Sequence, residues 1–331
     1  MPMAELHPAV QRALALASSH GTPARQAAAP APDAALRHLL RDRSPAEPAA
    51  WNDSKLGRSG FPVEISIAFG RPELRYTVEP AGPDTPPARR LSRAGAAIAA
   101  LSDESIEPAD LAAIASFQDN AALAYGAWIG GRHGAGKPRF KLYAEVPGRG
   151  AEHALAWGTR HLGDLSGIVR RGAWPVMAGW QPAGRRAELY LRTRRLFRAD
   201  VPLLMAAARL EHRADEVLGL LQDACCSAIE AALPAADFGV SIGAGPDGAS
   251  TFTLYAVAND LFGGDGRIRE TVLRVAAARG WDTHFYRALS EPLAGASGFV
   301  TRHGMFGIVV ASDQPATVAI GLTPDHPETS S

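Results

Sequence analysis

Residues 59–80 read SGFPVEISIAFGRPELRYTVEP, and this stretch decides how the rest of the chain is interpreted. Two segments of alternating apolar and polar residues, 62–69 and 73–79, flank a short turn that contains Gly70 and Pro72. Alternation with a period of two predicts β-strands, and a short turn of this composition between them predicts an antiparallel hairpin. One face of this hairpin is apolar, whereas the other carries charged and small side chains.

The same hairpin pattern recurs along the chain, each time after helical periodicity. Further strand pairs are predicted at 121–131 with 138–146, 174–182 with 185–193, 237–244 with 251–259, and 297–311 with 316–323. Helices are predicted at 4–18, 34–41, 91–102, 107–117, 151–171, 200–212, 214–233, 266–279 and 282–290. The repeated unit is therefore two helices followed by a hairpin (αα-ββ).

Ten antiparallel strands with one apolar face can remove their exposed edges by closing into a barrel, with helices covering the outside. A barrel of this size is wide enough to enclose a ligand chamber. The predicted fold class is thus α+β, a ten-stranded antiparallel β-barrel with a polar lumen surrounded by helices. An ordinary α+β protein with one open sheet is the alternative that the pattern leaves open.

The chain divides into three predicted parts. Residues 1–58 form an N-terminal helical segment of the first repeat, with an Ala/Pro-rich linker near 21–33. Residues 59–323 form the barrel, and residues 324–331 form a disordered tail.

The composition excludes several classes of function. The 331 residues include 34 basic and 34 acidic ones, so a general affinity for nucleic acid or acidic membranes is not expected. No apolar run reaches the roughly 18–20 residues of a membrane-spanning helix, and the N-terminus lacks the pattern of a signal peptide. Adjacent Cys225 and Cys226 are expected to be buried helix residues, which agrees with a reducing, cytoplasmic location.

Cations and tyrosines gather on the predicted lumen face. The cationic candidates are Arg75, Lys141, Arg186 and Arg192, with Arg139 as a further one. Three of the six tyrosines, Tyr143, Tyr190 and Tyr255, follow a repeated x-Leu-Tyr frame whose variable position holds Lys141, Glu188 or Thr253. Arginine binds phosphate oxygens with paired donors, and an aromatic face attracts a cation. These residue types predict a site for a diphosphate beside a carbocation.

Glu64 lies in the middle of the first strand, on the polar face. A carboxylate in this position needs a partner or a shifted pKa. It forms a salt bridge to Arg75 on the adjacent strand, or it accepts a hydrogen bond from an aromatic N–H or O–H; the sequence leaves both open.

Several common motifs do not occur in the chain. It has no DDxxD box, GxxxxGK[ST] loop, GxSxG elbow or HExxH helix, so the corresponding metal, nucleotide and hydrolase chemistries are disfavoured. The Gly-rich stretches 131–138 and 243–248 are interpreted as turns, with His133 and Lys137 in solvent.

The 59–80 stretch resembles the start of the barrel in the aromatic prenyltransferases of the dimethylallyltryptophan synthase group, which have the ABBA fold. In that group a Pro-x-Glu-x-Ser strand precedes an Arg-x-x-x-Glu-Pro strand, as residues 62–66 and 75–80 do here. The resemblance extends over about residues 59–323. It implies that Glu64 matches the catalytic glutamate that holds an indole N–H, and that Arg75 matches the first diphosphate-binding arginine.

Shorter motifs extend the resemblance. Lys141 and Tyr143 match a Lys-x-Tyr pair that contacts the diphosphate and shields the cation. Arg186-x-Glu188-x-Tyr190 stands where the family has Arg-x-Lys-x-Tyr, and Thr253-x-Tyr255 where it has Gln-x-Tyr. Glu188 and Thr253 are therefore departures that could modulate activity, and the last hairpin lacks the tyrosines of the family.

The resemblance implies transfer of a dimethylallyl group from its diphosphate to an aromatic acceptor, an indole such as tryptophan or a derivative, by electrophilic aromatic substitution. Diphosphate-binding residues would be Arg75, Lys141, Arg186 and Arg192, and cation-shielding residues Tyr143, Tyr190 and Tyr255. No metal or cofactor is expected, and Mg²⁺ is not implied. The alternative is a non-catalytic barrel that binds an anionic or isoprenoid ligand.

Overall fold

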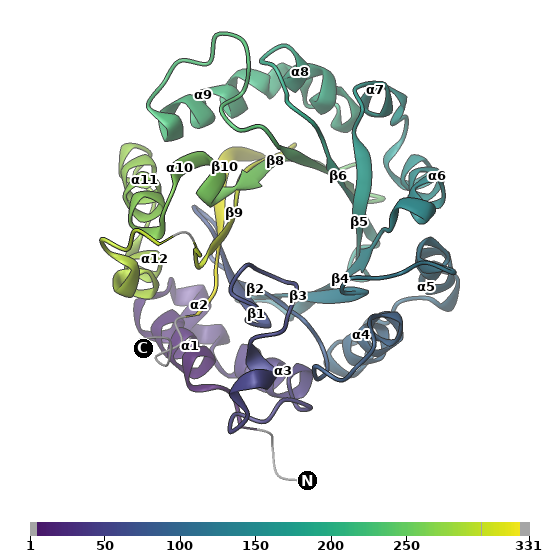
Figure 1. Ribbon diagram of the computed structural model, residues 1–331, viewed down its shortest axis with the longest axis vertical. Coiled ribbons are helices and arrows are strands. Elements are labelled where there is room, and N and C mark those ends of the chain that lie inside the picture. The colour runs from purple at the N-terminus through teal and green to yellow at the C-terminus, as the bar shows by residue number, and fades with distance from the viewer. Residues whose placement is uncertain (1–4, 299, 325–331) are drawn as a thin grey trace.

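Ten strands close into one antiparallel barrel in the computed structural model, which describes residues 5–298 and 300–324 (Figure 1). The strands are β1 (Val63–Ala68), β2 (Leu74–Val78), β3 (Ala127–His133), β4 (Arg139–Glu145), β5 (Trp174–Gln181), β6 (Arg186–Arg192), β7 (Gly239–Ala244), β8 (Ser250–Val257), β9 (His303–Ala311) and β10 (Gln314–Leu322). Strand β1 pairs with β10, with Ile65 opposite Leu322. The predicted closed barrel is confirmed, and the open-sheet alternative is wrong.

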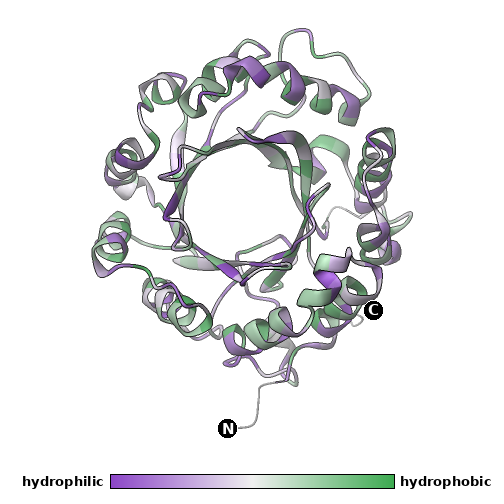
Figure 2. Cartoon of the chain, turned by 180° about the vertical axis from the view of Figure 1, so that it is seen from behind, coloured by the Kyte–Doolittle hydropathy of each residue, from purple (hydrophilic) through white to green (hydrophobic). Residues whose placement is uncertain are grey.

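Helices form a ring outside the barrel (Figure 1). They are α1 (Pro8–His20), α2 (Pro23–Ala28), α3 (Pro30–Leu39), α4 (Pro87–Leu101), α5 (Pro108–Ala115), α6 (Ala151–Leu162), α7 (Ser166–Arg170), α8 (Asp200–Met205), α9 (Ala214–Cys225), α10 (Ala258–Phe262), α11 (Asp265–Ala278) and α12 (His284–Leu289). Figure 2 shows hydrophobic and hydrophilic residues mixed along these helices, as expected when each buries one side. No helix among the described residues is long and apolar enough to cross a bilayer.

The hydrophobic core lies between the barrel wall and the helices. Outward-facing strand residues such as Val63, Ile65 and Leu142 are fully buried there. Along β1 the intervening residues Glu64 and Ser66 are only partly buried, because they face the lumen. The period-two alternation therefore places one face of each strand in the core and the other in the lumen.

The stretch 21–33 is not a loose linker, as the sequence suggested, because α2 and the first turn of α3 occupy it. Pro23 and Pro30 begin these helices, where the missing N–H of proline costs no hydrogen bond. The Thr22 side chain caps α2 by accepting from the backbone N–H of Arg25. Of the predicted tail, only Pro324 lies within the described residues.

Several element boundaries differ from the prediction, and two of these differences have a clear cause in the backbone conformation. Strand β3 begins at Ala127 rather than near 121, because Gly126 has a positive φ of 73° and ends an irregular loop. Helix α9 ends at Cys225, and Cys226 adopts a left-handed conformation with φ of 50°. Cys226 is therefore exposed rather than buried in a helix.

The barrel has two chemically different ends. At the hairpin end lie the tight turns that join the two strands of each pair, at residues 69–73, 134–138, 182–185, 245–249 and 312–313. At the helix end the strands connect to the surrounding helices. Because neighbouring strands are antiparallel, residues 75 and 139 lie toward the hairpin end, whereas residues 128, 143 and 255 lie toward the helix end.

Candidate active site

Lys141 and Glu188 form an ion pair across the lumen face of the barrel. The side chain of Lys141 passes over Gly179 on the strand between them, where a Cβ would lie 2.4 Å from Lys141 Cε. Lys141 also donates to the Tyr190 hydroxyl at 3.2 Å, and the Ser241 hydroxyl donates to the other Glu188 oxygen at 2.5 Å. The charge of Lys141 is thus already matched within the protein.

The pKa of Glu188 reflects this network. Burial alone would raise it, but Lys141, Ser241 and Tyr190 together outweigh burial and lower the pKa below its ordinary value. Glu188 therefore stays ionised in the neutral pH range and places a fixed negative charge in the lumen.

The three tyrosines of the x-Leu-Tyr frame form a continuous wall. The rings of Tyr143 and Tyr190 meet edge-to-face with centroids 5.8 Å apart, and those of Tyr190 and Tyr255 lie 6.3 Å apart. The Lys141 ammonium lies 5.0 Å from the Tyr143 ring centroid and 5.3 Å from that of Tyr190. This is the range in which aromatic faces stabilise a cation, so the structure brings the predicted cation-shielding residues together.

Glu64 projects toward two glycines of the last hairpin. A Cβ on Gly304 would lie 2.1 Å from Glu64 Oε2, and one on Gly321 would lie 2.3 Å from the Glu64 carboxyl carbon. Among the described residues, no group makes a hydrogen bond or ion pair with this carboxylate, and burial alone raises its pKa to about 7.

The proposed salt bridge between Glu64 and Arg75 does not form. Arg75 instead pairs with Glu73 at 3.1 Å, and the residue opposite Arg75 on β1 is Ser66. The other interpretation of Glu64 was that it accepts a hydrogen bond from a ligand. A carboxylate without a partner among the described residues supports this interpretation.

A row of arginines crosses three adjacent strands toward the hairpin end. Arg75 lies opposite Arg132, and Arg132 lies opposite Arg139. Glu73 bridges the outer two, at 3.1 Å from Arg75 and 3.0 Å from Arg139. Burial, followed by the charge of Arg132, lowers the pKa of Arg75 to about 10.

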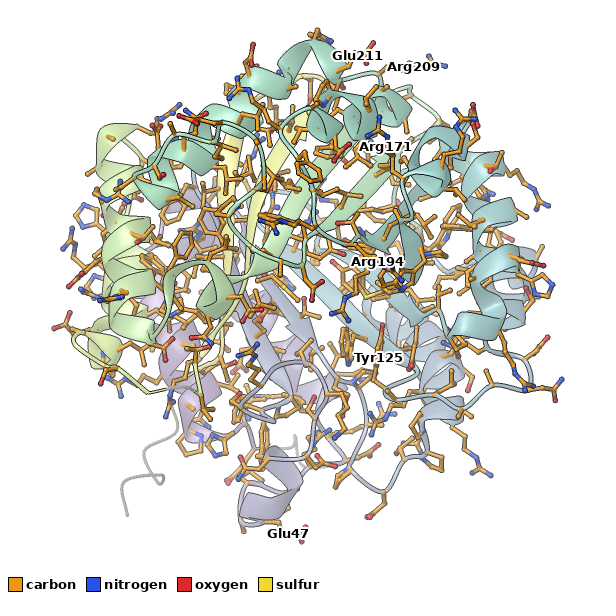
Figure 3. The ribbon with its side chains drawn as sticks, turned by 45° about the horizontal axis from the view of Figure 1, so that its top comes forward. Glu47, Tyr125, Arg171, Arg194, Arg209 and Glu211 are labelled. Atoms are coloured by element: carbon orange, nitrogen blue, oxygen red, sulfur yellow. The ribbon has the colours of Figure 1, made fainter. Side chains whose placement is uncertain are left out.

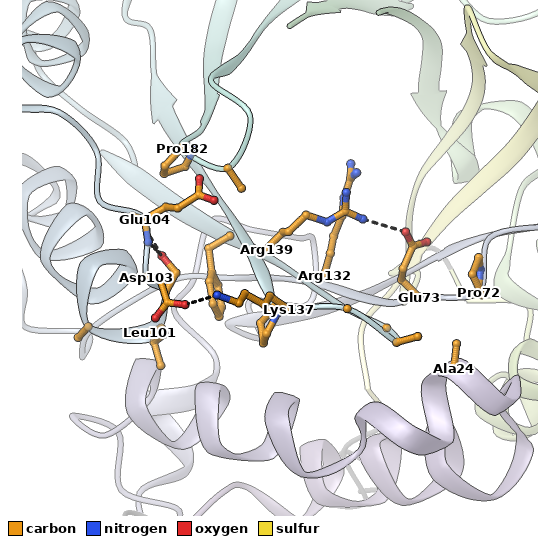
Figure 4. A pocket seen from close by; sticks show the side chains of 18 residues that line it. Ala24, Pro72, Glu73, Leu101, Asp103, Glu104, Arg132, Lys137, Arg139 and Pro182 are labelled. Atoms are coloured by element: carbon orange, nitrogen blue, oxygen red, sulfur yellow. Dashed lines mark hydrogen bonds and ion pairs between the residues drawn. The ribbon is translucent and has the colours of Figure 1, made fainter. Parts of the chain in front are cut away.

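A cavity of about 740 Å³ opens beside this row (Figure 4). Arg132, Arg139 and Glu73 line one side of it, and Asp103 and Glu104 line another. Lys137, on the turn between β3 and β4, pairs with Asp103 at 2.7 Å and is well exposed, as the sequence predicted.

His133 and Arg132 occupy the stretch that the sequence suggested was only a turn. His133 is buried on the outer face of the barrel, contrary to prediction, and its Nε2 lies 3.1 Å from the Tyr76 hydroxyl. Strand β3 extends through this stretch because β2 pairs with it as far as Leu74 opposite His133. The continued alternation of 127–133 is the signal that could have identified Arg132 as a lumen residue.

Two aromatic residues at the helix end were missed by the sequence analysis. Tyr125 stacks on Trp128 with ring centroids 3.8 Å apart, and Trp128 Nε1 donates to Glu79 at 3.4 Å. Burial, followed by the charges of Glu145 and the Tyr255 side chain, raises the pKa of Tyr125. Tyr125 therefore lies near the tyrosine wall; in Figure 3 it projects near the centre of the molecule, whereas Glu211 lies at the outer edge.

Glu145 fixes the loop that carries Tyr125. Its carboxylate accepts from three successive backbone N–H groups, those of Ala124 at 2.9 Å, Tyr125 at 2.7 Å and Gly126 at 2.7 Å. Such a cluster of charge-assisted hydrogen bonds holds the loop in one conformation.

The remaining predicted residues lie away from this cluster. Arg186 lies toward the hairpin end, 3.5 Å from Asp247, and donates to the Ala249 carbonyl. Arg192 lies at the helix end and pairs with Asp237 at 3.0 Å, with both side chains more than half exposed. Thr253 lies on the lumen face opposite Ser241 and Val309. Among residues 5–298 and 300–324, no group of three or more His, Cys, Asp or Glu side chains could hold a metal ion.

No protein-family model and no curated protein sequence matches the chain. Solved structures match it over nearly its full length. The apo form of prenyltransferase PriB superposes with a TM-score of 0.76 at 18% identity, covering 97% of each chain. The 6-dimethylallyltryptophan synthase from Micromonospora olivasterospora, in complex with DMASPP and Trp, gives 0.76 at 19% identity over 97% of this chain and 98% of the other.

The 5-dimethylallyl tryptophan synthase from Streptomyces coelicolor, also in complex with DMASPP and Trp, gives a TM-score of 0.75 at 19% identity, covering 96% of this chain and 93% of the other. At such identities the likeness establishes the fold. The chain has the ABBA barrel of the aromatic prenyltransferases, as the resemblance of residues 59–80 predicted.

Proposed function

We propose that this protein transfers a dimethylallyl group from an allylic diphosphate to an aromatic acceptor of the indole type. The observation that carries the proposal is the Glu64 carboxylate, which has no partner among the described residues and lies in a lumen whose wall is a continuous cluster of tyrosines. Neighbours of the same fold are described in complex with DMASPP and tryptophan, which supports both substrate classes.

The reaction begins when the bond between the allylic carbon and the diphosphate oxygen breaks. The electron pair leaves with the diphosphate, and cationic side chains offset its charge. The allyl cation faces Tyr143, Tyr190 and Tyr255, whose π-faces stabilise it without supplying a nucleophile. An electron pair of the aromatic ring then forms the new carbon–carbon bond.

Glu64 acts on the acceptor. Its carboxylate accepts a hydrogen bond from the acceptor N–H and stabilises the positive charge that the ring carries after attack. Transfer of a proton from the attacked ring carbon to the released diphosphate or to water restores aromaticity. With a pKa of about 7, Glu64 is substantially ionised under neutral conditions and available for this role.

The remaining elements of the proposal concern cofactors and location. The arginines of the lumen would provide the positive charge that a metal ion supplies elsewhere, so we propose that turnover does not require a metal. A chelator should then leave the rate unchanged. A cytoplasmic location stays a prediction from the sequence.

A donor–acceptor matrix analysed by mass spectrometry tests the function. Purified protein with dimethylallyl diphosphate and tryptophan or simple indoles should give a product heavier by one dimethylallyl group and should release diphosphate. Glu64→Gln should suppress the product, whereas Glu211→Gln, an exposed glutamate at the outer edge, should not. Absence of product across a broad panel of donors and acceptors would refute the proposal.

The Lys141–Glu188 ion pair favours a second candidate, a barrel that binds an anionic or isoprenoid ligand without chemistry. Here the lysine expected to contact diphosphate is already neutralised. Saturable binding of the intact donor, with the donor recovered unchanged in the presence of every acceptor, would identify this function instead.

A further inference from the structure

The arginine row carries more positive charge than the protein itself balances. Arg75, Arg132 and Arg139 occupy directly opposed positions on β2, β3 and β4, so their backbones are about 4.8 Å apart from strand to strand. The single carboxylate of Glu73 pairs with Arg75 and Arg139. Three guanidinium groups and one carboxylate leave a charge of about +2 at this position (3 − 1).

Arg132 is the least compensated member of the row. Within the described part of the chain it forms no hydrogen bond or ion pair with a carboxylate, and Glu73 attracts it only from a longer distance. The Nε of Arg75 is also buried, and none of residues 5–298 and 300–324 forms a hydrogen bond with it. A buried donor without a partner is costly, and an anion placed beside it removes that cost.

In the middle of the lumen, by contrast, the positive charge is already compensated by a carboxylate. Lys141 is bound to Glu188, which stays ionised and also accepts from Ser241. A multiply charged anion beside Lys141 would approach the Glu188 carboxylate and be repelled. The lysine position therefore offers no net positive charge to a diphosphate.

We infer that the diphosphate binds at the arginine row, with Arg132 as a main contact, rather than at Lys141. The inference rests on the proposed function. The row borders the 740 Å³ cavity at the hairpin end, which gives a charged ligand a route to it (Figure 4). The donor then extends from the arginines toward the tyrosines, and the acceptor lies near Glu64 at the helix end.

The carboxylates on the cavity wall do not remove this preference. Asp103 is paired with Lys137, and Glu104 lies on the α4–α5 connection, across the cavity from the strands that carry the arginines. The guanidinium groups lie on adjacent strands and can direct several donors to one anion.

Binding of inorganic diphosphate, measured by isothermal titration calorimetry without donor or acceptor, tests the inference. Arg132→Gln should weaken binding about ten- to a hundredfold, as expected for loss of a charge-assisted contact. Lys141→Gln should change it less than threefold. Arg209→Gln, an exposed arginine at the outer edge in Figure 3, is the matched control and should bind like the wild type.

Equal binding by Arg132→Gln and the wild type would overturn the inference, as would a larger loss in Lys141→Gln. Circular dichroism and the melting temperature of the free protein report whether each variant folds. If Arg132→Gln does not fold, Arg132→Lys keeps the charge but not the forked donors, and should still weaken binding severalfold. Turnover is measured separately, so a failure of the proposed function leaves the binding result intact and distinguishable.

Discussion

The two ends of the lumen differ in chemistry although the same strands build both. The hairpin end presents guanidinium groups from Arg75, Arg132 and Arg139, whereas the helix end presents aromatic rings and the carboxylate of Glu64. Strand β3 runs from Trp128 to Arg132, and β4 runs back from Arg139 to Tyr143. The order of residue types reverses between neighbouring strands, so antiparallel pairing collects like chemistry at like ends.

This difference between the two ends separates two requirements that would conflict at a single position. A leaving diphosphate needs positive charge, whereas an allyl cation is destabilised by it. With arginines at one end and tyrosines at the other, each part of the donor meets the environment that stabilises it. Substitutions at one end should therefore disturb its function while they leave the other end intact.

Removing the charge of Glu64 should have the largest effect. Glu64→Gln keeps the shape that Gly304 and Gly321 accommodate, but it replaces a carboxylate acceptor with a neutral amide. We expect kcat to fall by roughly two orders of magnitude or more, while binding of inorganic diphosphate at the hairpin end stays within twofold. A variant with near-normal kcat would show that Glu64 has no role in the chemistry.

The pH dependence of kcat/KM should report the same group. Because burial raises the pKa of Glu64 to about 7, the active carboxylate is lost as the pH falls below that value, and kcat/KM should drop about tenfold per unit. This decrease of kcat/KM at low pH should be absent from the residual activity of Glu64→Gln. A flat profile of the wild type between pH 5 and 8 would contradict the assignment.

Over the same pH range, the free energy of unfolding should change in the opposite direction to kcat/KM. The folded protein keeps the Glu64 proton up to about pH 7, whereas the unfolded chain releases it near the ordinary value of 4.5. The free energy of unfolding of the wild type should therefore decrease relative to Glu64→Gln as the pH rises from about 4.5 to 7. Denaturant titrations of both proteins at several pH values measure the difference.

Removing the Glu145 carboxylate, which holds the Tyr125 loop, should have an intermediate effect. Glu145→Ala leaves three backbone N–H groups without their acceptor, and we expect a loss of about 3 kcal/mol in the free energy of unfolding. The KM for the acceptor should rise, because the Tyr125–Trp128 stack loses its fixed position at the helix end. Glu145→Gln retains a carbonyl acceptor and should therefore lose less stability. An unchanged acceptor KM in Glu145→Ala would show that the Tyr125–Trp128 stack is not part of the acceptor site.

The smallest effect should come from releasing Lys141. Glu188→Gln removes the carboxylate that neutralises it, so inorganic diphosphate should bind a few times more tightly as the ammonium becomes available. Calorimetry with wild type and variant at one ionic strength measures the change. Weaker binding by the variant would mean that Glu188 holds Lys141 in a binding-competent position, which would argue against the separation of the two ends.

Much of the fold was predictable because period-two alternation is a local property. It identified all five hairpins, and the resemblance at residues 59–80 correctly indicated the barrel. The tyrosine wall also followed, since Tyr143, Tyr190 and Tyr255 occupy equivalent positions on three strands.

What the sequence did not predict depends on register and on contacts between distant segments. The Lys141–Glu188 pair requires β5 to present Gly179 between β4 and β6, and no local pattern specifies that alignment. The position of Tyr125 depends on its loop, which the Glu145 carboxylate holds from the far end of β4. Arg192 is exposed because it ends its strand at the rim, where alternation no longer determines burial.

The pairing of β1 with β10 has a consequence for how the protein is made. Ile65 pairs with Leu322, which lies far from it in the sequence, so the barrel cannot close before β10 has been synthesised. Contacts between residues so far apart in sequence form slowly, and the nascent chain must keep β1 unpaired on one side until β10 is available. We therefore expect this protein to depend on chaperones during expression far more than its closed native form would suggest.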